Sequence, residues 1–287
     1  MIRPLLAATA TLALALPALA QEGSIKDNSF LLEEAYNQEG GVVQHIGVLQ
    51  HLEAGAGWAF TFTQEWPLWG QRNQLSYTIP VLDGERTTGL GDVGIHYRYQ
   101  VAGGGDEWLA LAPRLSMFFP TGKDREGNGA GSVGLQAGLP ASVTLGSHFV
   151  THLNTSVTLT PSSRNPAGNA ATAFDFIGGG SLVWLAAPTM NFLVEAVYAR
   201  TDEVLGEGRT RGHDEVLLNP GVRFAFNLPG GRQVVPGLSY TFGVGPSAGS
   251  NSAVLVYLSF EHPFSDGGLT GSSAARKFSR SPARSIQ

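Results

Sequence analysis

The sequence contains no cysteine, so it can form neither a disulfide nor a thiolate metal site. It is also poor in charge, because Asp, Glu, Lys and Arg make up only 14% of its 287 residues. The formal net charge of -5 provides no basic excess, and we predict no nucleic-acid partner. Beyond the N-terminus, no stretch approaches the roughly 18 consecutive apolar residues of a membrane-spanning helix. These features exclude disulfide scaffolds and ordinary transmembrane helices.

An apolar leader opens the chain. Arg3 is its only charged residue, an apolar run follows, and the leader ends on the small residues of Ala18-Leu19-Ala20. The run is too short to anchor the chain in a membrane, so the pattern predicts a secretory signal peptide over residues 1–20, cleaved after Ala20. Cleavage removes one positive charge and takes the formal net charge from -5 to -6. We therefore expect an exported protein.

The stretch 90–122 alternates with a period of two. Its first arm places one set of residues on an apolar face, Val93, Ile95, Tyr97, Tyr99 and Val101, and a second set on a mostly polar face, Asp92, Gly94, His96, Arg98 and Gln100. After the turn AGGGDE, a second arm alternates in the same way up to Phe119. Period two indicates β-strands, and each arm is longer than the usual strand of about five or six residues. Such strands suit a wall with lipid on one side and water on the other.

The same alternation recurs along the rest of the chain. We predict strands at 42–52, 57–66, 74–81, 90–101, 108–119, 132–140, 146–159, 173–185, 190–201, 215–226, 232–243 and 252–264. One face of these strands is apolar or aromatic, and the opposite face is mostly polar. Their even number and sequential order predict an all-β fold, a twelve-stranded antiparallel up-and-down transmembrane β-barrel.

Connection lengths support a barrel over its alternative, a soluble β-sandwich. The predicted connections 120–131, 160–172 and 202–214 are long, and those between them are short. Outer-membrane barrels have short periplasmic turns and longer external loops, whereas a sandwich has no reason to keep this asymmetry.

Four segments follow along the chain. We predict a signal peptide at 1–20, a periplasmic N-terminal segment at 21–41, the outer-membrane barrel at 42–264 and a disordered tail at 265–287. Residues 30–38 have the pattern of one or two helical turns, which we place at the periplasmic mouth or inside the lumen. The last strand resembles the C-terminal strand that the barrel-insertion machinery recognises. We therefore expect that machinery and outer-membrane lipid as partners.

Two sets of side chains are candidate site residues. The lumen-lining candidates are Asp92, His96, Arg98, Arg114, His148, His152, Glu195 and Arg223, and the lipid-interface aromatics are Trp58, Trp66, Tyr97, Tyr99 and Tyr198. Charges in the lumen could set solute selectivity, or they could form a packed network that fills the barrel. Small lumen residues favour a narrow or gated solute path, namely Gly94, Ala110, Ala112, Ser116, Gly221 and Gly237.

Catalytic and metal chemistry receive little support. His148 and His152 would stand roughly 13 Å apart on one strand, too far for a single ion. Twelve-stranded outer-membrane phospholipases use a serine, a histidine and an asparagine, but Ser156 would lie equally far from His152. We predict no enzyme activity, no cofactor and no metal.

Four short stretches carry a resemblance to a known family: SFLLEEAYNQEGGVVQH, GLGDVGIHYRYQ, PRLSMFFPTG and NFLVEAVY. They resemble the outer-membrane transporter family related to the meta-pathway phenol degradation protein. The resemblance implies a porin-like channel in the outer membrane of a Gram-negative bacterium, passing small molecules that are often aromatic or apolar. The alternative function is a closed barrel with a structural, adhesion or surface-interaction role.

Overall fold

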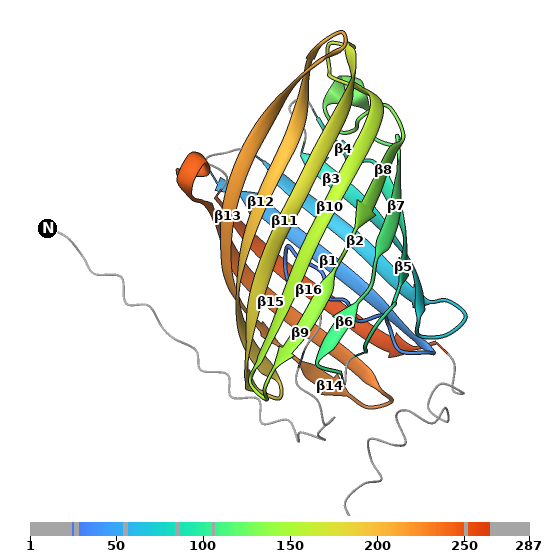
Figure 1. Cartoon of the computed structure of the whole chain (residues 1–287), viewed down its shortest axis with the longest axis vertical. Helices are drawn as coiled ribbons and strands as arrows, with labels where there is room; N and C mark the ends of the chain where they lie inside the picture. Colours follow the sequence, from blue (N-terminus) through green and yellow to red (C-terminus); the bar gives the residue numbers. More distant parts are fainter. Residues whose placement is uncertain are drawn as a thin grey trace, which may run out of the picture.

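The computed structural model describes residues 25, 29–53, 57–83, 87–104, 107–249 and 252–264. The predicted signal peptide and C-terminal tail lie outside these residues. The described chain is almost entirely β-strand and pairs into a single antiparallel sheet that closes on itself (Figure 1). Within the described ranges, none of the helical elements is long and apolar enough to cross a membrane.

The sheet contains sixteen strand elements. They are β1 (Val42–Leu52), β2 (Trp58–Pro67), β3 (Asn73–Asp83), β4 (Thr88–Leu90), β5 (Val93–Tyr99), β6 (Leu109–Leu111), β7 (Arg114–Phe119), β8 (Gly134–Gly138), β9 (Ala141–Leu145), β10 (Phe149–Arg164), β11 (Ala170–Ala187), β12 (Met190–Gly206), β13 (Arg209–Phe224), β14 (Phe226–Leu228), β15 (Arg232–Gly243) and β16 (Ala253–Pro263). Four pairs of elements, β4 with β5, β6 with β7, β8 with β9 and β13 with β14, each form one wall strand, which leaves twelve strands (16 - 4). The predicted twelve-stranded antiparallel barrel is confirmed.

The first and last strands close the barrel. β1 pairs with β16 in continuous register from Val42 opposite Pro263 to Leu52 opposite Ala253. Just beyond this ladder, the N–H of Phe264 donates to the carbonyl of Gly41 at 2.9 Å. The chain therefore enters the wall at the seam where the sheet closes.

Two prolines interrupt adjacent wall strands at the same level. Pro113 separates β6 from β7, and Pro140 separates β8 from β9. Proline cannot donate to a sheet ladder, so regular pairing stops there. Its carbonyl still accepts, and the Ala112 N–H reaches the Pro140 oxygen at 3.1 Å. The strands are interrupted at this level, but hydrogen bonding across the wall continues.

One side of the barrel is much taller than the other. Strands β10 to β13 contain 16, 18, 17 and 16 residues, whereas β1, β2 and β3 contain 11, 10 and 11. The tall strands form two hairpins that rise beyond the opposite wall (Figure 1). We call the end of the barrel with these hairpin tips and segment 120–133 the loop end, and the other the turn end.

Three predicted strand boundaries are wrong. Most of 160–172 and 202–214, predicted to be loops, belongs to the tall hairpins. These strands leave the apolar band, so their outward positions carry charges such as Arg200 and Asp214, paired at 3.1 Å. Apolar alternation, the signal we used, is lost there. In addition, Ala141–Leu145 is strand β9, and the turn follows at 146–148.

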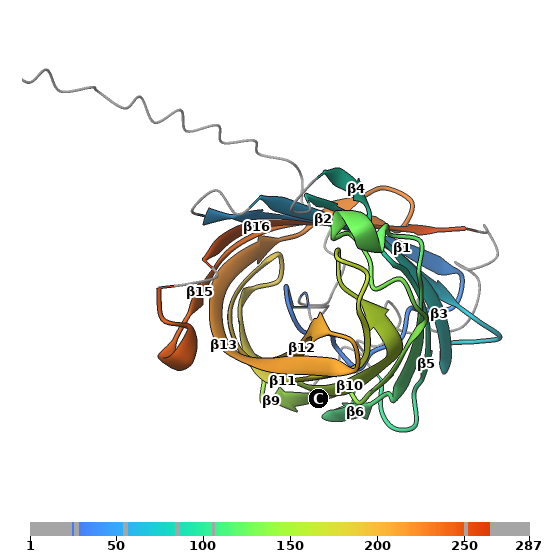
Figure 2. The same cartoon turned by 90° about the horizontal axis from the view of Figure 1, so that it is seen from above.

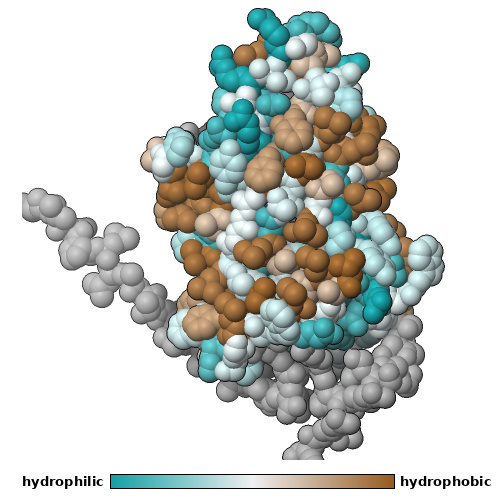
Figure 3. All heavy atoms as spheres, in the orientation of Figure 1, coloured by the Kyte–Doolittle hydropathy of each residue, from teal (hydrophilic) through white to brown (hydrophobic). Residues whose placement is uncertain are grey.

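The outward face of the wall is apolar. Leu182, Phe192 and Leu238 are 44%, 42% and 53% exposed on this face. Figure 3 shows such side chains gathered across the middle of the barrel, with hydrophilic residues over the tips of the tall hairpins. An apolar band bordered by polar ends is the arrangement expected of a barrel surrounded by lipid.

Candidate functional site

The residues that precede β1 lie inside the barrel. Figure 2 shows the blue N-terminal trace within the ring of strands, and Phe30, Leu32 and Ala35 are all buried. We call residues 25 and 29–41 the plug. The predicted helix at 30–38 is wrong, since these residues form bends. Their backbone N–H and C=O groups bond to side chains of the wall instead of to each other.

Glu195 on β12 anchors the first part of the plug. Its fully buried carboxylate accepts the backbone N–H groups of Phe30, Leu31 and Leu32 at 3.3, 2.9 and 3.0 Å. The Asn219 side-chain amide on β13 donates a fourth hydrogen bond at 2.6 Å. Hydrogen bonds to an ionised acceptor are about twice as strong as neutral ones. Glu195 therefore acts in this structure as a clamp for the plug.

Arg98 on β5 holds the second part of the plug. Its guanidinium donates to the carbonyls of Glu34 and Tyr36 at 2.9 and 2.7 Å and to the Asn37 side-chain oxygen at 2.9 Å. A further bond at 3.1 Å reaches the Gln74 side chain on β3. One buried cation thus links the plug to two wall strands.

Arg114 on β7 lies directly opposite Arg98 in the β5–β7 register. Its guanidinium donates to one carboxylate oxygen of Glu33 in the plug. The other oxygen of Glu33 is 3.7 Å from Arg98 Nη1. A single plug carboxylate therefore lies between two arginines of the wall.

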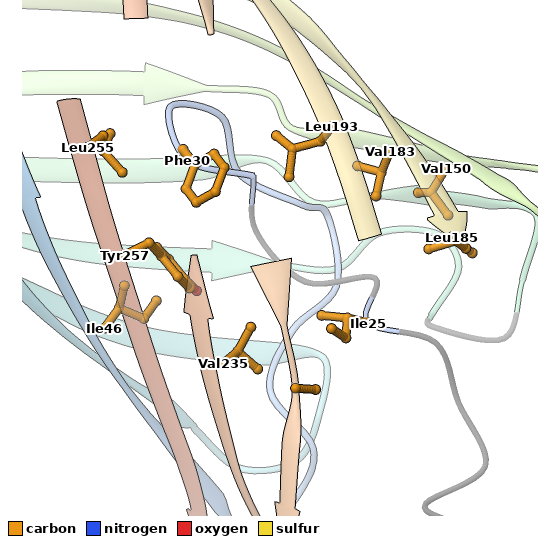
Figure 4. Packing of buried hydrophobic residues seen from close by; sticks show 11 residues of the cluster. Ile25, Phe30, Ile46, Val150, Val183, Leu185, Leu193, Val235, Leu255 and Tyr257 are labelled. Atoms are coloured by element: carbon orange, nitrogen blue, oxygen red, sulfur yellow. The ribbon is translucent and has the colours of Figure 1, made fainter. Parts of the chain in front are cut away.

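The lumen wall near the turn end is apolar, which corrects our prediction of a mostly polar inner face. Its buried cluster contains Ile25, Phe30, Ile46, Val150, Val183, Leu185, Leu193, Ala225, Val235, Leu255 and Tyr257 (Figure 4). The Phe30 ring meets the Tyr257 ring edge-on at 5.8 Å. Two predicted small lumen residues make room for it, since a Cβ at Gly237 would lie 2.6 Å from the Phe30 ring and one at Gly221 2.3 Å. The plug fills the space that we had assigned to a solute path.

Replacing Gly237 by alanine should loosen the plug. The new methyl group overlaps only side-chain atoms of Phe30 and Arg223, and overpacking of this kind costs about 1–3 kcal/mol. Because the chain has no cysteine, a Ser29→Cys background reports plug release by maleimide labelling. We expect labelling to accelerate by about tenfold or more. Gly40→Ala is the control, since nothing lies within 4 Å of its added Cβ, and equal rates in the two variants would contradict the fit of Phe30 against Gly237.

The other predicted lumen residues have varied positions. His96 is buried with Nε2 at 3.1 Å from Thr78 Oγ1, and Arg223 is fully buried and donates to Asn191 at 3.3 Å. His148 does not line the lumen, because it is exposed in the turn 146–148. Our prediction began the strand at Gly146 and therefore placed His148 on it, although Gly146 and Ser147 are both residue types common in turns.

The predicted interface aromatics lie on the wall. Tyr97, Tyr99 and Tyr198 are each exposed, and the Trp58 and Trp66 side chains are half-buried. The Tyr198 hydroxyl donates to Asp214 at 2.7 Å, towards the loop end. A polar tip on an apolar ring suits the boundary between lipid and water.

The serine that contacts His152 is not the predicted candidate Ser156. Ser142 on β9, rather than Ser156, contacts His152, with its Oγ 2.8 Å from Nδ1. Ser142 also accepts the N–H of Ala35 at 2.8 Å, and all three residues are fully buried. The plug therefore covers this pair. Across the described parts of the chain, no group of three or more potential metal ligands is found.

An open cavity of about 270 Å³ lies on the loop side of the plug. It is lined by Asp92, Phe118, Ala130, Ser132, Gly134, Gln136, Thr158, Thr160 and Asp175. Asp92 accepts the N–H groups of Gly122 and Ala130 at 2.9 and 2.7 Å, which ties down the segment 120–131. Gln136 connects the cavity to Arg114, because its side-chain oxygen accepts a hydrogen bond from Arg114 Nη2 at 3.1 Å.

Comparisons with known proteins support the fold. No family model matches the sequence, so the resemblance to the phenol degradation family gains no support there, and no curated protein is significantly similar. An outer membrane channel from Pseudomonas putida F1 superposes with a TM-score of 0.60 at 12% identity, over 79% of this chain and 97% of that one. The NanC porin gives 0.52 at 8% identity, over 77% and 98%. The fold is that of outer-membrane channels and porins.

Proposed function

We propose that the protein is an outer-membrane channel through which small molecules pass passively, with the plug as its movable closure. The observation that carries this proposal is that residues 29–41 lie inside the lumen as one segment outside the strands of the sheet. Side-chain contacts hold this segment, so it can leave without breaking the wall. The proposal includes export through a cleaved signal peptide at 1–20 and insertion by the barrel-insertion machinery.

The inner surface suggests the class of solute. Release of the plug would expose the apolar cluster around Leu193, Val235 and Leu255 together with the charges of Arg98 and Arg114. Small molecules with an aromatic or apolar body fit this surface, in agreement with the family that the sequence resembles. The alternative is a permanently closed barrel with a structural, adhesion or surface-interaction role, because the same contacts also stabilise a filled lumen.

Planar-bilayer recording tests the proposal. The chain from residue 21 to 287 is folded in detergent, and its heat-sensitive gel mobility establishes that the barrel has formed. We expect discrete conductance steps. Silent bilayers from correctly folded protein, both with the plug and without it, would support the closed barrel instead.

Replacing Arg114 by alanine should change the ion preference of the open channel. The substitution removes a positive charge from the lumen and one of the contacts to Glu33, so we expect a shift towards cations and more frequent opening. The reversal potential in a salt gradient measures the preference. Arg200→Ala is the control, because Arg200 is exposed and pairs with Asp214. If Arg114→Ala behaves like wild type, Arg114 does not line the path.

A further inference from the structure

We propose that Arg98 and Arg114 form a carboxylate-binding site for the solute and that Glu33 occupies this site as a tethered stand-in. The inference rests on the proposed channel function and deepens it, because it names the solute class as small organic acids with an apolar body. Glu33 contributes only a carboxylate to the pair, so a solute carboxylate can replace it.

The register of the wall creates the site. Arg98 and Arg114 are direct partners in the β5–β7 ladder, and like charges placed opposite one another destabilise a sheet. Their side chains are only 3% and 18% exposed, so water screens the repulsion poorly. An anion between them removes this cost. The wall is therefore built to hold a negative group at this point.

Glu33 meets this requirement with its two carboxylate oxygens, one towards each arginine. Asn154 on β10 fixes its backbone, because the side-chain oxygen accepts the Glu33 N–H at 3.1 Å and the side-chain nitrogen donates to the Glu33 carbonyl at 2.7 Å. Arginine presents a planar set of donors that matches a carboxylate. The geometry is that of a ligand in its site.

The neighbouring cavity provides room for the rest of a solute. Gln136 lines the cavity and also contacts Arg114, and the Phe118 ring lines the same cavity. Its volume of about 270 Å³ lies below the range of about 300–1,000 Å³ for drug-sized ligands, which suits a single ring. Asp92 and Asp175 also face the cavity, and their negative charge would orient an acid with its carboxylate towards the arginines.

When the plug leaves, the positive charges of Arg98 and Arg114 lose the carboxylates that neutralise them. Glu34, whose carboxylate is 3.5 Å from Arg98 Nη2, leaves together with Glu33. Glu65 on β2 reaches Arg98 through Gln74, which donates to Glu65 at 2.8 Å and accepts from Arg98 at 3.1 Å. An entering carboxylate can restore the lost charge.

Chemical rescue of Glu33→Ala tests the site. The variant keeps the plug backbone but vacates the space between the arginines. Benzoate binding to the full-length folded chain in detergent is measured by calorimetry, with benzyl alcohol as the neutral probe. We expect the benzoate affinity to rise by about tenfold or more over wild type, because the internal competitor is gone, and the benzyl alcohol affinity to stay unchanged. Glu39→Ala, an equal charge change at an exposed plug position, should leave both affinities as they are.

A second substitution tests whether the gain in benzoate affinity depends on Arg114. Adding Arg114→Gln to Glu33→Ala should abolish the gain in benzoate affinity, while heat-sensitive gel mobility shows that the barrel still folds. Equal gains for benzoate and benzyl alcohol, or no gain for benzoate, would overturn the inference. Binding does not require conduction. Benzoate binding by a barrel that stays silent both with and without the plug would therefore contradict the proposed function, and conductance without selective binding would contradict the carboxylate site.

Discussion

Removal of plug residues 25–38 should raise the single-channel conductance by on the order of tenfold, because the lumen of a twelve-stranded barrel is wide enough for a solute only when nothing else fills it. The plug meets both surfaces of the lumen, with Phe30 in the apolar cluster and Glu33 between the arginines. Residues 39–41 stay in the variant, because Glu39 and Gly41 accept the N–H groups of Val42 and Phe264.

Planar bilayers measure this effect directly. The control is a chain that lacks residues 265–287, which shortens the protein at its other end and leaves the plug in place. Its conductance should equal that of wild type. If deletion of the plug leaves the conductance unchanged in a barrel with normal heat-sensitive mobility, wall side chains close the lumen and the plug is not the closure.

Replacing Glu195 by alanine should release the first part of the plug while the rest of the wall stays intact. Four donors converge on this carboxylate, and a hydrogen bond to a charged group contributes about 1.5–3 kcal/mol. The contributions of the four hydrogen bonds do not add up, so we take a total loss of about 3 kcal/mol of docking free energy. This loss corresponds to an increase of about a hundredfold in the fraction of molecules whose plug is undocked. In the Ser29→Cys background, maleimide labelling should accelerate by that factor.

Glu203→Ala is the control for this experiment. Glu203 lies on the same strand, is exposed, and pairs with His213 at 2.9 Å, away from the plug. Its labelling rate should match that of the Ser29→Cys parent. A Glu195→Ala protein that labels no faster than this control would show that Arg98 and the apolar cluster hold the plug without Glu195.

The wall could be predicted from the sequence because lipid imposes a period of two. Along most of the apolar band, as from Phe192 to Tyr198, alternation located the strand correctly, although it missed β9. Where strands extend past that band, outward positions carry charged pairs such as Arg200 and Asp214, and alternation indicates loops. The break at Pro113 was likewise lost within a single predicted strand, because the apolar pattern continues across it. The predicted strand 132–140 ended at Pro140 and therefore missed β9 beyond it.

The contents of the lumen were harder to predict. Alternation placed Arg98, Arg114 and Glu195 on the inner face, but their partners lie about 60 to 165 positions away in a segment without period-two alternation. The apolar residues of that segment are spaced as they would be on one side of a helix. Their spacing reflects separate contacts with the wall, since Phe30 fits beside Gly237 while the Ala35 N–H donates to Ser142. Only the three-dimensional structure shows which residues of the plug contact which residues of the wall.

The short connection between Glu33 and the seam at Gly41 has a consequence for when the channel would work. A group tied by a short flexible linker competes for its site at an effective concentration in the millimolar range. That value is fixed by chain length and does not change with the amount of protein in the membrane. On the proposed mechanism, a dilute organic acid loses to Glu33, and a concentrated one displaces it. The plug would thus set a threshold of external supply below which the barrel stays shut.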